Sequence, residues 1–145
     1  MALSKAFETY ERPGLVVSYK VSNVKIFKGA NVGVNSLGYL VPMSHATASL
    51  KFVGVANDTV DNTAGAAGDK SLNVTKTGSF VFKAAAGFTP GQADIGKEVY
   101  GLTDWEVQIS TVGLTNQYKV GTIVASETTS TGVTGVRVRV DNYSV

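Results

Sequence analysis

Alternation of apolar and polar residues dominates the chain and predicts β-strands. Residues 135–140 read Gly-Val-Arg-Val-Arg-Val, and a period of two places the valines on one face and Arg137 and Arg139 on the other. Similar β-branched or aromatic runs recur from residue 15 onward. We expect strands at residues 15–21, 24–27, 39–41, 50–56, 71–77, 79–83, 98–100, 106–110, 118–125 and 135–140.

Glycine and proline separate the predicted strands. Gly78 falls between two of them and predicts a bulge or a tight bend. Residues 89–95 offer one short helical turn, with Thr89 as N-cap and Pro90 at the first helical position, although nearby glycines favour a loop. Many short strands with glycine-rich punctuation predict an all-β fold, either a small β-barrel or a β-sandwich-like domain.

Two stretches lack a strand period. Residues 57–70 are rich in Gly, Ala, Asn and Asp and predict a long glycine-rich loop. Residues 1–14 mix aromatic and charged side chains, and termini of that kind are loose unless a partner holds them. We therefore expect an extended N-terminal arm with the first strand at residues 1–22, followed by a β-barrel-like domain at residues 23–145.

Composition narrows the class of protein. A length of 145 residues suits one domain with a real core. The 13 Lys and Arg against 11 Asp and Glu give a net charge of +2, too small to favour a nucleic-acid or membrane partner. No run approaches the ~18 apolar residues of a membrane span, and the first residues lack the apolar core of a signal peptide. We expect a soluble protein made in a reducing cytoplasm.

Residues suited to catalysis or metal binding are sparse. The absence of Cys excludes thiolate nucleophiles, disulfides and Cys-ligated metals. The single histidine, His45, follows Ser44, but neighbours on a strand point to opposite faces, so we interpret it as a loop or surface residue. Asp58, Asp61 and Asp69 do not have the spacing of a calcium loop. We therefore predict no catalytic residue, no metal and no cofactor.

Two sets of glycine and valine motifs occur in a recognisable order. The first set is Phe-Val-Gly-Val-Ala at residues 52–56, the Gly/Ala-rich segment 61–69 and Leu-Asn-Val-Thr-Lys-Thr-Gly-Ser-Phe at 72–80. The second is Ala-Asp-Ile-Gly-Lys-Glu-Val-Tyr-Gly-Leu-Thr-Asp at 93–104, Val-Gln-Ile-Ser at 107–110, Val-Gly-Thr-Ile-Val at 120–124 and Val-Arg-Val-Arg-Val at 136–140. Together they resemble the bacteriophage capsid cement, or head decoration, proteins. The likeness spans about residues 24–140 and leaves Trp105 unmatched.

This resemblance implies a β-barrel-like structural protein of the virion. It would be made in the host bacterial cytoplasm and would bind the outer capsid surface, where it stabilises neighbouring major capsid subunits. The implied partners are the major capsid protein and copies of itself, with a trimer favoured and a dimer possible, and neither nucleic acid nor membrane. The family has no catalytic residues to carry over.

The side chains expected at the capsid or protomer interface come from the two ends of the chain. Aromatic residues on a loose arm suit burial against a partner, and a solvated basic strand face suits the rim of a protein interface. The expected residues are Phe7, Tyr10, Arg12, Arg137 and Arg139.

Two alternative functions remain open. One is another phage structural β-protein, such as a tail-tube or head–tail component, although residues 57–70 are too rich in Gly and Ala for the long hairpin expected of a tube protein. The other is a carbohydrate-binding β-sandwich with exposed aromatics clustered at Trp105, Tyr100 and Tyr118, of which Tyr100 is better explained by strand packing. An enzyme is the least favoured class.

Overall fold

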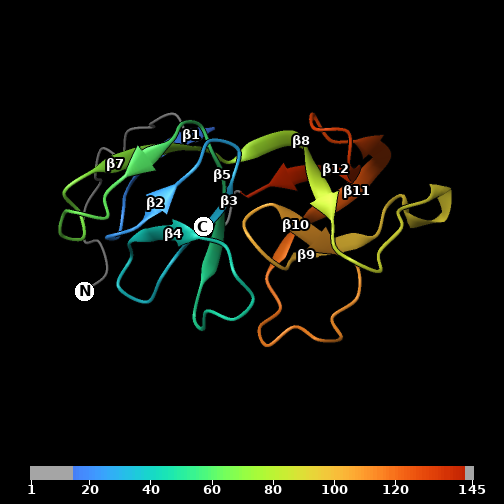
Figure 1. Cartoon of the computed structure of the whole chain (residues 1–145), viewed down its shortest axis with the longest axis horizontal. Coiled ribbons are helices and arrows are strands. Elements are labelled where there is room, and N and C mark those ends of the chain that lie inside the picture. Colours follow the sequence, from blue (N-terminus) through green and yellow to red (C-terminus); the bar gives the residue numbers. More distant parts are fainter. Residues whose placement is uncertain (1–14, 143–145) are drawn as a thin grey trace, which may run out of the picture.

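The computed structural model describes residues 15–142 and confirms the all-β prediction. Two β units lie side by side along the long axis of the molecule (Figure 1). We call residues 16–75 the open-sheet unit and residues 77–141 the barrel unit. Helical structure in the described part of the chain is limited to one 3₁₀ turn, η1 (Gln92–Asp94).

The open-sheet unit consists of an antiparallel five-stranded sheet and a separate two-stranded ribbon. The sheet has the order β1-β7-β5-β3-β4, and the ribbon pairs β2 with β6. The strands are β1 (Val16–Lys20), β2 (Lys25–Ile26), β3 (Asn31–Val34), β4 (Leu40–Pro42), β5 (Lys51–Ala56), β6 (Val60–Asp61) and β7 (Ser71–Thr75).

The barrel unit is a closed five-stranded barrel. Its strands run in the order β10-β8-β12-β11-β9, and β9 pairs with β10 to close the ring. All neighbours are antiparallel except β10 and β8, which are parallel. The strands are β8 (Thr77–Ala84), β9 (Glu98–Gly101), β10 (Glu106–Gln108), β11 (Lys119–Thr128) and β12 (Thr134–Asp141).

Strand β12 shows how the sequence pattern builds the barrel. Val136, Val138 and Val140 are fully buried inside it, whereas Arg137 and Arg139 point outward, as the period of two predicts. The barrel therefore has a valine-rich interior and a charged outer face along this strand.

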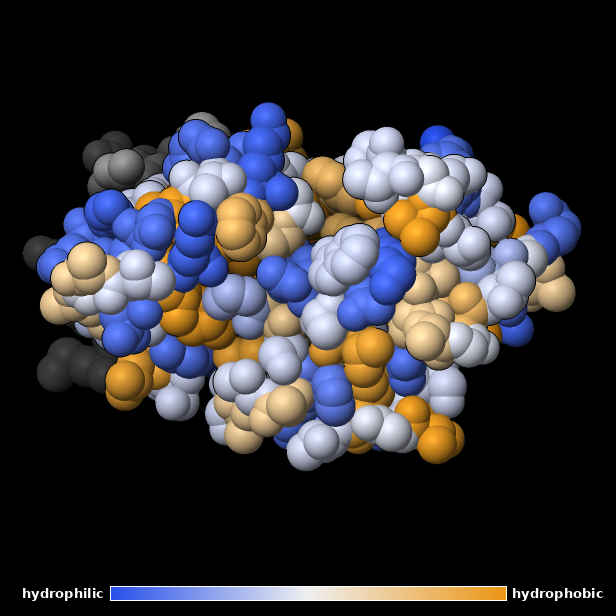
Figure 2. Space-filling view, in the orientation of Figure 1, coloured by the Kyte–Doolittle hydropathy of each residue, from blue (hydrophilic) through white to orange (hydrophobic). Residues whose placement is uncertain are grey.

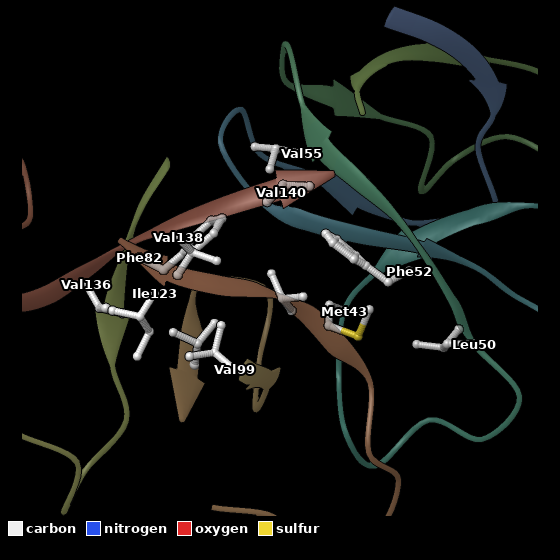
Figure 3. Packing of buried hydrophobic residues seen from close by; sticks show 12 residues of the cluster. Met43, Leu50, Phe52, Val55, Phe82, Val99, Ile123, Val136, Val138 and Val140 are labelled. Carbon is white, nitrogen blue, oxygen red and sulfur yellow. The ribbon is translucent and has the colours of Figure 1, made fainter. Parts of the chain in front are cut away.

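Two hydrophobic clusters fill the molecule, and one of them joins the units. The barrel cluster takes in four residues of the open-sheet unit, among them Phe52 and Met43. Figure 3 shows these two side chains between the open sheet and the strands of the barrel. The second cluster belongs to the open-sheet unit alone and consists of Val21, Ile26, Ala30, Val32, Leu40, Val53, Ala56, Leu72 and Val74.

A single buried residue, Lys76, links β7 to β8. Its ammonium group lies 2.8 Å from the Tyr19 hydroxyl and 5.4 Å from the centre of that ring, which accommodates the charge away from bulk water. Its backbone N–H donates to the carbonyl of Leu15, and its carbonyl accepts from the N–H of Asn142. Both ends of the described chain therefore meet at this link.

Several sequence predictions differ from the structure in detail. The break between the two strands lies at Lys76 and not at Gly78, where it was predicted. Gly78 lies inside β8 with a φ of 144°. The short helical turn exists but has Gly91 as N-cap in place of Thr89. The predicted glycine-rich loop contains the short strand β6, and β3 was not predicted at all.

The first strand is part of a sheet. β1, grouped with the arm in the sequence analysis, pairs along its whole length with β7. This pairing places the first strand at an edge of the open sheet, next to the strand that leads into the barrel.

Candidate functional site

The outer face of the barrel along β12 carries the two arginines that the sequence analysis singled out. Arg137 lies opposite Val81 on β8 and Ala125 on β11. Arg139 lies two residues further along the same face, in register with Ser79 and Thr122. The strand register therefore places both guanidinium groups on the same outer surface, which is formed by β8, β12 and β11.

Each arginine is paired with a carboxylate. Arg139 Nε lies 2.7 Å from Asp141 Oδ2, and Arg137 Nη1 lies 3.5 Å from Glu127 Oε1. All four side chains are partly exposed, so each pair contributes little to folding stability. The surface is therefore balanced in charge, which differs from the long basic track that nucleic-acid backbones require.

Arg137 retains hydrogen-bonding capacity. Its Nε atom is buried and has no hydrogen-bond partner among the described residues. Guanidinium groups bind carboxylates through two parallel hydrogen bonds. Because Nε is buried, a partner's carboxylate reaches this donor only if the Arg137 side chain changes conformation. The 3.5 Å contact with Glu127 is long enough to be exchanged for a partner's acceptor.

Two hollows meet at this face. One, of about 420 Å³, is lined by residues of β8, β11 and β12 that include Arg137, Arg139 and Asp141. The other, of about 480 Å³, lies between the two units and is lined by Phe52, Tyr118, Arg139 and Asp141 among others. Because Arg139 and Asp141 border both hollows, the β12 face continues into the groove between the units. We call this surface the β12 face.

Aliphatic side chains flank the arginines. Val81 is 37% exposed and Val124 is 38% exposed, each on a strand next to β12. Such a mixture of arginine and apolar surface is typical of protein interfaces. Elsewhere, Figure 2 shows hydrophobic residues scattered among hydrophilic ones over the face in view.

The three arm residues named in the sequence analysis, Phe7, Tyr10 and Arg12, lie outside the described residues. The structure therefore brings together only Arg137 and Arg139 from the expected interface set.

His45 lies in a loop, as the sequence analysis predicted. Its Nδ1 accepts a hydrogen bond from the N–H of Thr115 at 3.1 Å, and its carbonyl accepts from the backbone and side chain of Asn116. Its own N–H donates to the carbonyl of Leu102. The histidine thus ties a loop of the open-sheet unit to two loops of the barrel unit.

The carboxylates of the glycine-rich loop bind the loop itself. Asp61 accepts from the hydroxyl and N–H of Thr63, which lowers the pKa of that carboxyl, and Asp69 accepts from the N–H of Ala66. Asx side chains commonly stabilise turns in this way. Within residues 15–142, no group of three or more His, Asp or Glu side chains is arranged to hold a metal ion.

The three aromatic residues named for the carbohydrate-binding alternative each contact different neighbours. The Tyr118 hydroxyl donates to the carbonyl of Thr47 at 2.6 Å, and the Tyr100 hydroxyl lies 3.4 Å from Glu98. Trp105 lines a pocket together with Phe27 of the other unit. The sequence analysis did not identify Phe27 as a site residue, because only the fold brings it near Trp105. The one sequence feature that pointed to Phe27 was its aromatic side chain at the end of a predicted strand.

Comparisons with known proteins give no match: no family model fits the chain, and neither the curated proteins nor the solved structures include a significant relative. Among the described residues, no helix is long and apolar enough to cross a membrane.

Proposed function

We propose that this protein is a structural component of a bacteriophage virion that binds the outer capsid surface and cements neighbouring major capsid subunits. The motif order in residues 52–80 and 93–140 supports the family, and the closed all-β barrel agrees with the fold that the family implies. The observation that carries the proposal is the β12 face, where two arginines, two exposed valines and a groove between the units form one surface.

The chemistry of the β12 face suits a protein partner. Each arginine already has a carboxylate neighbour, so an incoming acidic side chain exchanges one ion pair for another with little uncompensated charge. The partly exposed Arg137 side chain also carries Nη donors for a partner's carboxylate. Modest contacts of this kind become strong binding when a symmetric assembly of several copies, a trimer in our proposal, engages many capsid sites together.

The arm supplies a second set of contacts in this proposal. Phe7 and Tyr10 would bury aromatic surface against the capsid, and Arg12 would bind a carboxylate there. Strand β1, which the arm leads into, has β7 as its only strand neighbour among the described residues, so its other side is an edge suited to strand addition.

Co-sedimentation with empty, expanded heads tests the function. The heads are assembled from the major capsid protein encoded in the same genome, and light scattering measures the oligomeric state of the free protein. We expect saturable binding at a fixed copy number per head. If the wild-type protein does not bind heads, or binds only to tails in the same preparation, the proposal is wrong and the tail-component alternative gains support.

Variants locate the binding face. Arg137→Ala with Arg139→Ala should weaken head binding at least tenfold, because both charged contacts are lost. Lys97→Ala with Lys70→Ala is the matched control, because it removes two exposed cations elsewhere, and it should bind as the wild type does. Equal affinity of the double-arginine variant and the control would contradict the assignment of the β12 face. Deletion of residues 1–14 tests the arm in the same assay.

A further inference from the structure

A second surface of the molecule holds two exposed aromatic rings. Phe27 follows β2 in the open-sheet unit, and Trp105 precedes β10 in the barrel unit. Together with Lys28, Gly29, Ala30 and Asp104 they line a pocket of about 370 Å³. Phe27 is 57% exposed and Trp105 is 48% exposed. We call this site the aromatic pocket.

Backbone hydrogen bonds fix the two sides of the aromatic pocket relative to each other. The N–H of Asn31 donates to the carbonyl of Asp104 at 2.7 Å and so joins the two units at a residue that lines the pocket. The carbonyl of Trp105 accepts from the N–H of Lys83 at 3.0 Å, and the carbonyl of Phe27 accepts from Ala30. The pocket is therefore pre-formed, as small-ligand sites usually are.

Each aromatic ring is held by a lysine. Lys25 Nζ lies 4.9 Å from the centre of the Phe27 ring, and Lys83 Nζ lies 4.7 Å from the centre of the Trp105 ring. Lys83 is itself anchored to Glu106 at 2.9 Å. These contacts limit the freedom of the rings, so a ligand that packs on them loses little side-chain entropy.

Asp104 provides a hydrogen-bond acceptor in the same pocket. Among the described residues, its carboxylate receives a hydrogen bond only from its own backbone N–H. Burial raises the pKa of this carboxyl, and the nearby Glu106 raises it further. A carboxylate that is half-buried without a strong protein partner is stabilised by a ligand that donates hydrogen bonds to it.

We propose that the aromatic pocket is a saccharide-binding subsite that holds one pyranose ring of a glycan. A pyranose has an apolar C–H face that packs on aromatic rings and a rim of hydroxyl groups that hydrogen-bond to a carboxylate and to ammonium groups. The aromatic pocket offers both kinds of surface: two rings, the Asp104 carboxylate and the amine of Lys28, which forms no ion pair with a described residue. Its volume fits a ligand of this size.

The charged residues around the rings distinguish a saccharide from a protein partner. The centres of protein interfaces are depleted in Lys, Glu and Asp because these groups lose their hydration there. Lys25, Lys28, Lys83, Asp104 and Glu106 all lie at or beside the two rings. A polyhydroxylated ligand satisfies these groups with hydrogen bonds, so the observations favour a sugar over a second protein.

Intrinsic fluorescence tests this subsite directly, because Trp105 is the only tryptophan in the chain. The purified protein is titrated with glucose-, galactose- and mannose-terminated oligosaccharides, both neutral and containing uronic acids, with ethylene glycol as the non-saccharide control. We expect a saturable change in Trp105 emission for at least one oligosaccharide, with a dissociation constant roughly in the millimolar range.

Variants tie the signal to the aromatic pocket. Phe27→Ala keeps the tryptophan reporter and should weaken binding at least tenfold, and Asp104→Asn should weaken it several-fold. Val112→Ala removes another exposed apolar side chain and should bind like the wild type. Melting temperatures of all variants establish that they are folded.

Each outcome decides the proposal. If no oligosaccharide produces saturable binding, or if Phe27→Ala binds as the wild type does, the saccharide subsite is wrong. If Phe27→Ala instead weakens head binding, the aromatic pocket is a protein contact and the proposal is also wrong. The titration uses no heads, so its result is independent of the proposed capsid function.

Discussion

The two halves of this molecule solve the problem of strand edges in different ways. The barrel closes its five strands into a ring, so every strand has a neighbour on each side. The outer strands of the open sheet are β1 and β4, and only one isolated parallel bridge, between Val21 and Leu40, connects their ends. Free edges expose unpaired backbone groups and invite pairing with other chains. The barrel is therefore suited to stability, and the open sheet retains the capacity to add a strand.

The hydrophobic cores of the two units also differ, because only one of them is confined to a single unit. The open-sheet cluster contains residues of that unit alone. The barrel cluster, by contrast, incorporates Met43, Leu50, Phe52 and Val55 from the open sheet. The barrel therefore supplies the cover for one face of the open sheet, and a defect at this contact should affect both units.

The largest expected effect comes from Phe52→Ala, which tests that shared core. Loss of this buried ring should cost about 3–5 kcal/mol of unfolding free energy, comparable with Phe82→Ala inside the barrel. Chemical denaturation followed by Trp105 fluorescence and by circular dichroism measures it. Both probes should shift together; separate transitions for Phe52→Ala would show that the units fold independently.

Glycines at strand crossings provide the next test, one in each unit. A Cβ atom at Gly54 would collide with the carbonyl of Thr75, and one at Gly121 would collide with the carbonyl of Arg139. Gly54→Ala and Gly121→Ala should each cost about 2–4 kcal/mol, since backbone atoms cannot move aside cheaply. Gly91→Ala is the control, because its Cβ meets no atom closer than 4.0 Å. Thermal melts that rank all three variants equally would contradict this comparison.

A smaller effect is expected at Asn62, which fastens the glycine-rich loop to the open-sheet unit. Its buried amide donates to the carbonyls of Val21, Ser22 and Ala66. Asn62→Ala should cost about 2 kcal/mol, because these carbonyls lose their donor. Hydrogen exchange should show faster opening of residues 57–70 but little change in the barrel. Asp58→Ala, an exposed change in the same loop, should leave both unchanged.

Asp104→Asn is expected to have the smallest effect and a distinct pH dependence. The pKa of Asp104 is raised in the folded state, so its contribution to stability is full below the ordinary Asp pKa and is lost as pH rises through the folded value. The variant should therefore melt slightly higher than the wild type at pH 7, with the difference vanishing near pH 3. A lower melting temperature at pH 7 would indicate that the carboxylate stabilises the fold.

Other carboxylates change the stability of the fold with pH in the opposite direction. The melting temperature of Asp104→Asn must therefore be compared with that of the wild type at each pH. Hydrogen bonds lower the pKa of Asp94, which accepts from Lys97, and of Glu98, which accepts from Lys119. Their stabilising contributions are present above the ordinary carboxyl pKa and decrease as the solution is acidified. Both groups are unchanged in Asp104→Asn, and their effects cancel in the difference.

Strands with a strict period of two could be predicted from the sequence, because side-chain alternation is a local property. β12, with its buried valines and outward Arg137 and Arg139, is the clearest case. β3 was missed because its burial comes from neighbours on both faces, which removes the alternation. The two-residue strand β6 is too short to show any period.

The sites depended on contacts that sequence spacing does not encode. The pairing of Arg137 with Glu127 follows from strand register, which a local pattern suggests only in part. The meeting of Phe27 with Trp105 follows from how the two units pack, and these residues are far apart in the chain. No local signal in the sequence could have joined them.

The hydrogen bonds at Lys76 have a consequence for how the connectivity of the chain can be changed. Leu15 and Asn142 both hydrogen-bond to the backbone of this one residue, so the described chain is nearly a closed loop. A short peptide joining residue 142 to residue 15 should permit circular permutation, with new ends cut in the turn between β11 and β12. Fusions placed before residue 15 or after residue 142 should emerge from the same point on the surface.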